Sequence, residues 1–257
     1  MDGWLSEVQR RPALFVLCSS LGFRLLHRLL QNLPRPAVVD LPWKNWKWQN
    51  LSVSLVHSLL TGTWAILCMF QYPVIMLDLN SFYTPWSYLL IIISTGYFIQ
   101  DAGDIILSGY ARESWEFLLH HMLVNQGAFS VIPPFLYVVL TSHYVGGAVV
   151  ALFVEVNSIF LHLRQKLKLA GVAKDSLIYS TNKLLNFTTY VSFRLGAQFY
   201  ITWYIVYNYS WLAHAFYFLV SIMLMNIMIL IYFYRLLRAD FFKQCNHQNG
   251  IQKFAQD

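Results

Sequence analysis

Two carboxylates and two histidines stand within long apolar stretches of this chain. Asp101 and Asp104 are three residues apart, a spacing that puts both side chains on one face of a helix. His120 and His121 follow in the next apolar stretch. An imidazole beside a carboxylate acts as a base or a nucleophile in acyl transfer, with the carboxylate orienting the ring. These four residues are therefore the predicted catalytic set.

Four further polar residues fall within apolar stretches and are predicted to line a lipid cavity: His57, Glu155, Asn157 and Arg194. A charge at the centre of a membrane helix costs about 2.5–3.5 kcal/mol, so each charged residue there needs a function or a partner. A structural alternative stays open for the two aspartates. Their carboxylates would then hold helices together by pairing with Arg194 or with a histidine.

The sequence carries no signature of a cofactor or a metal. It lacks a serine nucleophile elbow, a phosphate-binding loop and a glycine-rich dinucleotide fingerprint. Adjacent residues point about 100° apart on a helix, so His120 and His121 do not readily face one metal ion. We therefore expect no cofactor and no metal. Whether the protein is an enzyme stays open.

Composition indicates an integral membrane protein with no room for a soluble catalytic domain. Of the 257 residues, 57% are hydrophobic and 12% are charged, and the mean hydropathy is +0.48. A soluble domain carries about 25% charged residues because it needs a solvated surface. The net charge of +6 fits basic cytoplasmic loops better than a nucleic-acid surface, so no nucleic-acid partner is expected.

The elements that must position these side chains are seven apolar segments, each near the roughly 20 residues that span a bilayer. We predict an all-α, polytopic membrane helical bundle. The segments are Ala13–Gln31, Gln49–Tyr72, Trp86–Leu107, Trp115–Val131, Phe135–Leu163, Lys183–Tyr207 and Ala213–Leu237. The fifth contains Gly146 and Gly147 after two prolines, which predicts a kink or a break there.

Basic residues predict the orientation of the bundle. Lys and Arg gather in every second connection between the segments, including the one that holds Arg164 and Lys166, and in the tail after the last segment. The positive-inside rule then places the N-terminus outside and the C-terminus in the cytosol, which requires an odd number of spans. Arg24, His27 and Arg28 are expected to extend from the first segment to the cytosolic surface.

Several motifs resemble the TLC domain, which translocating-chain-associating membrane proteins and ceramide synthases share. They are His57–Gly62, Gly96–Asp104 and Trp115–His121. Two more, Leu152–Leu161 and Ile231–Phe241, narrow the resemblance to TLC domain-containing proteins 1 and 2. The resemblance predicts residues 46–241 as a six-helix TLC domain. Residues 1–45 then form an N-terminal segment with the first transmembrane helix, and residues 242–257 form a cytosolic tail.

The resemblance implies a regulator of membrane phospholipid composition and fluidity. Such a protein limits the incorporation of long-chain polyunsaturated fatty acids into phospholipids at the plasma membrane, with the endoplasmic reticulum as the alternative location. Its partners are membrane phospholipids or acyl lipids, together with other membrane proteins. His120 and His121 match the histidine pair of ceramide synthases, so the resemblance implies a membrane acyltransferase with acyl-CoA as its substrate as one alternative function. An accessory subunit of a channel or transporter is another.

Overall fold

The computed structural model describes residues 3–110 and 134–242. Every regular element in these ranges is helical, which confirms the all-α prediction. The elements in chain order are α1 (Gly3–Arg10), α2 (Pro12–Gln31), η1 (Ala37–Val39), α3 (Pro42–Gln71), α4 (Val74–Leu77), α5 (Pro85–Leu107), α7 (Pro134–Thr141), α8 (Val145–Ala151), α9 (Val154–Leu169), α10 (Leu177–Thr189), η2 (Tyr190–Leu195), α11 (Gly196–Tyr207), α12 (Ala215–Leu237) and η3 (Arg238–Phe242).

Five helical stretches are long and apolar enough to cross a membrane, which confirms a multi-pass membrane protein. They are Pro12–Gln31, Pro42–Gln71, Pro85–Leu107, Val145–Leu169 and Ala215–Asp240, and they match the predicted first, second, third, fifth and seventh segments. The predicted sixth segment lies in α10, η2 and α11, which follow one another without a break. The predicted fourth segment, Trp115–Val131, lies outside the described residues. The count of seven therefore stays a prediction.

The predicted fifth segment is broken, as expected, but the glycines do not make the break. Helix α7 ends at Thr141, and Ser142 and Tyr144 follow with positive φ angles of 57° and 62°. Gly146 lies inside α8, where an added Cβ would come within 3.0 Å of the Asp78 carbonyl oxygen. Gly146 is thus needed for close packing against the segment after α4, while the residues before α8 turn the chain.

Small residues let the long helices approach closely. In α3, a Cβ on Gly62 would lie 3.0 Å from the backbone nitrogen of Val156 in α9. In α5, a Cβ on Gly96 would lie 2.5 Å from the Cβ of Ser19 in α2. The Ser19 hydroxyl also donates a hydrogen bond to the Ile93 carbonyl at 3.0 Å. Close backbone approach of this kind is a common way to pack helices in lipid, where apolar burial gives no advantage.

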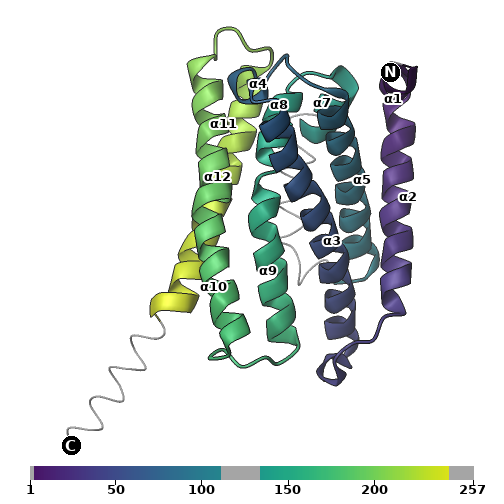
Figure 1. Ribbon diagram of the computed structural model, residues 1–257, viewed down its shortest axis with the longest axis vertical. Helices are drawn as coiled ribbons and strands as arrows, with labels where there is room; N and C mark the ends of the chain where they lie inside the picture. The colour runs from purple at the N-terminus through teal and green to yellow at the C-terminus, as the bar shows by residue number, and fades with distance from the viewer. Residues whose placement is uncertain (1–2, 111–133, 243–257) are drawn as a thin grey trace, which may run out of the picture.

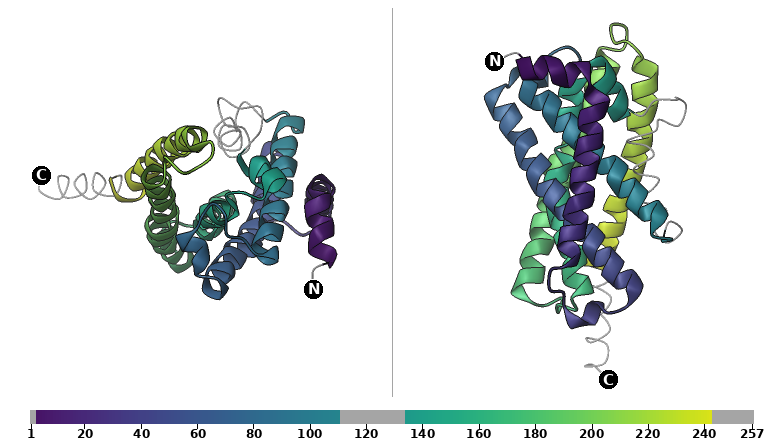
Figure 2. Two further views of the ribbon diagram at one scale, coloured as in Figure 1. Left: turned by 90° about the horizontal axis from the view of Figure 1, so that it is seen from above. Right: turned by 90° about the vertical axis from the view of Figure 1, so that its right-hand side faces the viewer.

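The helices stand side by side along one axis, with α2 at one edge of the bundle and α12 near the other (Figures 1 and 2). Helix α1 and the end of α12 lie at opposite ends of the bundle (Figure 1). The connections α2–α3 and α9–α10 lie at the same end as the end of α12. These connections and their flanking turns hold Arg35, Lys44, Lys168 and Lys174, so we call this the basic end.

Candidate functional site

The carboxylate of Asp104, near the end of α5, is held by three side chains from α2 and α3. Its Oδ1 accepts a hydrogen bond from Arg24 Nη1 at 2.8 Å and lies 3.4 Å from His27 Nδ1. Its Oδ2 accepts one from Trp46 Nε1 at 3.0 Å. Asp104 is only 7% exposed. These donors compensate a charge that would be costly to bury alone.

Asp101 lies one turn before Asp104 and faces α3 as well. Its Oδ1 accepts a hydrogen bond of 2.6 Å from Asn50 Nδ2. Both aspartates are buried on the same side of α5, as their spacing predicts. The prediction that the cationic side chains of α2 extend to the membrane surface is wrong for His27, which is buried beside Asp104, whereas Arg24 stays exposed while it pairs with the same carboxylate. The cation paired with Asp104 is thus Arg24 and not Arg194.

A second polar group joins α3, α5 and α9. His57 is completely buried, and its Nδ1 lies 3.8 Å from Glu155 Oε2. The same carboxylate oxygen accepts a hydrogen bond of 2.6 Å from the Ser58 hydroxyl. The Tyr97 ring stacks on the imidazole with a centroid distance of 3.7 Å and an interplanar angle of 14°. An imidazole beside a carboxylate can hold or pass a proton inside the bundle.

A third polar group lies between α9 and the α10–η2 stretch. Asn157 is fully buried, and its Nδ2 lies 2.9 Å from the Asn186 carbonyl and 3.1 Å from the Thr189 hydroxyl. The next residue, Ser158, accepts a hydrogen bond of 2.8 Å from Arg194 Nη2. Asn157 and Arg194 thus both lie where α9 packs against the α10–η2 stretch, and the Ser158 that binds Arg194 is adjacent to Asn157.

The π-helix η2 keeps this polar stripe facing inward. The buried residues Asn182, Asn186, Tyr190, Arg194 and Gln198 recur every fourth position. In an α-helix of 3.6 residues per turn, each such step overshoots a full turn by about 40°, so the stripe would drift around the helix. The wider turn of η2 takes up this drift. Arg194 and Gln198 therefore stay buried.

At the basic end, helix α9 runs farther than the sequence predicts. Arg164 and Lys166 were expected in a connection, whereas α9 extends to Leu169 and includes both. Arg164 Nη2 donates to the Asp240 carboxylate of η3, and both side chains are buried. Lys166 Nζ donates to the Ser52 hydroxyl at 2.6 Å and lies 4.1 Å from the centroid of the Trp48 ring.

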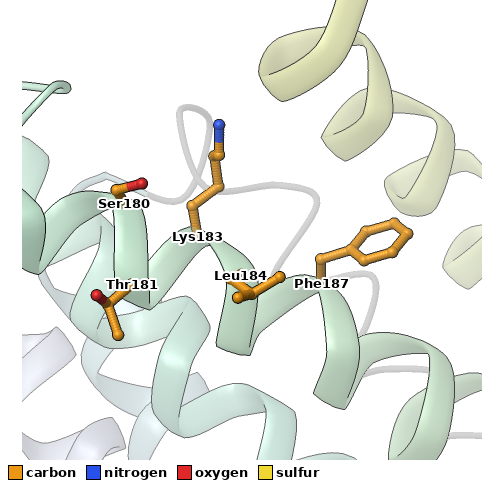
Figure 3. A pocket seen from close by; sticks show the side chains of 5 residues that line it. All are labelled: Ser180, Thr181, Lys183, Leu184 and Phe187. Carbon is orange, nitrogen blue, oxygen red and sulfur yellow. The ribbon is translucent and has the colours of Figure 1, made fainter.

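The structure also has a pocket of about 310 Å³ on α10 (Figure 3). It is lined by Ser180, Thr181, Lys183, Leu184 and Phe187. None of the predicted site residues is in this lining. The buried ionisable groups are the better guide to function, because a charge within a membrane bundle is costly and a surface hollow is not.

The predicted residues that the structure describes fall into three groups. His57 and Glu155 come together, Asp101 and Asp104 bind side chains of α2 and α3, and Asn157 lies beside the Ser158 that binds Arg194. His120 and His121 lie outside the described residues. Within the described ranges, no group of three or more histidines, cysteines and carboxylates is arranged to hold a metal ion.

Sequence reasoning missed the partners of the aspartates. Trp46 and Asn50 lie one turn apart on α3 and supply donors to Asp104 and Asp101. A tryptophan and an asparagine near a helix start are usual at a membrane interface, so their types gave no signal. The only sequence hint was the pair of acidic residues itself, which required donors from a neighbouring helix.

Known proteins with similar sequences cover nearly the whole chain. The TLC domain family matches residues 47–238. TLC domain-containing protein 1 of Rattus norvegicus is 42% identical over 228 residues, covering 88% of this chain and 89% of the relative. The human protein of the same name is 40% identical over 232 residues, covering 90% and 91%. TLC domain-containing protein 2 of Danio rerio is 42% identical over 229 residues, covering 88% and 89%. Because the family matches residues 47–238 and these relatives align over most of their length, the chain belongs to the TLC domain family.

Proposed function

We propose that this protein regulates the acyl composition of membrane phospholipids and so the fluidity of the membrane. It limits the incorporation of long-chain polyunsaturated fatty acids into phospholipids, and it acts without catalysing the acyl transfer itself. Membership of the TLC domain family supports this proposal. The carrying observation is the buried His57–Glu155 pair, which gives a membrane-spanning bundle a polar interior. Ionisable groups at such depth are by default functional.

The proposed location is the plasma membrane, with the N-terminus outside and the C-terminus in the cytosol. The gathering of the α2–α3 and α9–α10 connections and the end of α12 at the basic end supports this orientation (Figure 1). Lys and Arg accumulate on the cytoplasmic side of membrane proteins, so the basic end would face the cytosol. The proposed partners are membrane phospholipids or acyl lipids, with other membrane proteins as regulators or targets.

Depletion of the protein tests the proposed function. Cells that lack it and are fed polyunsaturated fatty acids are expected to gain polyunsaturated phospholipids and to lose membrane order. The measurements are mass spectrometry of phospholipid acyl chains and fluorescence of an order-sensitive membrane dye. Re-expression of the full chain serves as the control and should restore both values. Acyl profiles that stay unchanged after depletion would remove the proposal.

The His pair separates regulation from catalysis. In depleted cells, the His120→Ala/His121→Ala double variant is expected to restore the lipid composition as well as the natural sequence does, per molecule of folded protein. A regulator that does not catalyse acyl transfer needs no imidazole nucleophile. If instead the folded variant has no effect on the lipids, and labelled acyl-CoA is consumed only by the natural sequence, the acyltransferase alternative replaces the regulator.

A further inference from the structure

Arg194 is a buried cation whose contacts within residues 3–110 and 134–242 are all uncharged. It is 8% exposed, and its Nη2 donates to the Ser158 hydroxyl at 2.8 Å. The guanidinium carbon lies 5.4 Å from the centroid of the Tyr190 ring. Its Nε is buried and has no hydrogen-bond partner in the described part of the chain. Among the residues that the structure describes, none of the carboxylates lies within ion-pair distance of Arg194.

Two other arginines of this bundle are each paired with a carboxylate. Arg164 is as deeply buried as Arg194, and it pairs with Asp240. Arg24 is exposed, yet it pairs with Asp104. A buried charge without an opposite charge is costly, since a hydroxyl and an aromatic face offset only part of the lost hydration. Within the described residues, the charge of Arg194 is therefore not compensated by a carboxylate, and an anionic ligand would neutralise it.

The surroundings of Arg194 suit a group with two acceptor oxygens on an apolar chain. A guanidinium is a planar fork that binds the two oxygens of a carboxylate together. Beside it, Tyr190 and Leu195 pack with Ile229, Tyr232 and Phe233 of α12 into an apolar cluster. Helix α12 is mostly exposed on its outer side, with 22% of its apolar window buried. Among the described residues, the cluster thus lies beside a helix whose apolar side chains are mostly exposed.

The position of Arg194 along the helical run favours one class of anionic lipid over another. It follows the 13-residue α10 and precedes the 12-residue α11, so it lies near the middle of the helical run. In the predicted sixth span this position is near the middle of the bilayer, about half a bilayer thickness from the phosphate headgroups at the membrane surface. A single-chain lipid that carries its charge on a carboxylate can leave the surface more easily than a two-chain phospholipid.

We propose that Arg194 binds the carboxylate of a fatty acid inside the bundle, with the acyl chain against the apolar cluster on α12. The choice of an acyl lipid rests on the proposed function. The choice of an anionic ligand rests on the buried positive charge of Arg194. A protein that holds free fatty acids in this way would keep them from being built into phospholipids, which deepens the proposed function by naming its ligand.

Binding of oleate to the purified full-length protein in detergent tests this site. The full chain is expected to bind oleate about tenfold or more tightly than methyl oleate, because the ester keeps the chain and lacks the charge that strengthens a hydrogen bond. Arg194→Gln should lose this preference, and Arg194→Lys should keep part of it as a point charge. Native mass spectrometry reads the bound lipid directly. Equal affinity of the full chain for oleate and methyl oleate would overturn the proposal whether or not the variants fold.

Arg238→Gln is the matched control, because it removes the same charge at an exposed residue of the other π-helix, η3. It should bind oleate as the natural sequence does, and a loss equal to that of Arg194→Gln would contradict the proposal. Oleoyl phosphatidic acid and oleoyl-CoA test a phosphate as the anion, and tighter Arg194-dependent binding of either would overturn the carboxylate assignment. Normal oleate binding with unchanged acyl profiles in depleted cells would remove the proposed function and leave the site standing.

Discussion

Asp240→Ala is expected to lower the free energy of unfolding by about 3–5 kcal/mol, the largest effect of a single substitution that we predict. Asp240 in η3 and Arg164 in α9 are both buried, and they form an ion pair at the basic end. Removal of the carboxylate leaves the guanidinium of Arg164 buried without a counter-charge. The measurement is thermal unfolding of the purified protein in detergent, followed by tryptophan fluorescence and by size-exclusion chromatography of heated samples.

A double variant distinguishes an unpaired charge from lost packing. Arg164→Met/Asp240→Leu is expected to recover most of the stability, because replacement of a whole buried ion pair by apolar side chains is often neutral or stabilising. Glu7→Ala is the control for an exposed pair, since Glu7 lies 3.7 Å from Arg10 at the surface and should change stability little. If the double variant loses as much free energy of unfolding as Arg164→Met and Asp240→Leu lose when added together, the ion pair is not the source of the effect.

Gly96→Ala is expected to displace α2 from α5 and to cost about 1–3 kcal/mol of stability. The new Cβ would lie 2.5 Å from the Ser19 Cβ and 2.7 Å from the Val16 carbonyl oxygen, and the latter belongs to the backbone. A rotamer change cannot relieve a clash with backbone, so α2 itself must move. Movement of α2 also loosens the contact between Arg24 and Asp104, so the melting temperature should fall.

Gly103→Ala on the same helix supplies the matched control. A Cβ at Gly103 meets nothing within 4 Å among the described residues, so this substitution should stabilise the protein by up to about 1 kcal/mol through helix propensity. The two glycine variants are thus expected to shift the melting temperature in opposite directions. A Gly96→Ala protein at least as stable as Gly103→Ala would show that α2 does not pack on α5 through this contact.

Hydropathy predicts the spans of this protein well, because a bilayer imposes one length and one polarity on every helix that crosses it. The predicted first segment, Ala13–Gln31, differs from α2 by a single residue at its start. The break before α8 was harder to place. Proline and glycine are the usual signals for a break, whereas here Ser142 and Tyr144 adopt the left-handed conformation and Gly146 serves packing.

The partners of buried side chains were less predictable than the spans. Sequence alone shows that Arg194 stands in an apolar helix, but not that η2 turns it toward Ser158. A π-helical turn holds about one residue more than an α-helical turn, and no residue type shows where such a turn will form. His27 was misassigned for a related reason, since a histidine near the end of a membrane helix can reach water or a neighbouring carboxylate, and the sequence does not show which.

The contact between Arg24 and Asp104 joins residues 80 positions apart, and it sets an order of events during synthesis. At about 5–20 residues per second, a ribosome needs roughly 4–16 s to make the chain between them. Throughout that interval the first span is already made, while the carboxylate that neutralises it does not yet exist. The ion pair that joins α2 to α5 can therefore form only after α5 has been made.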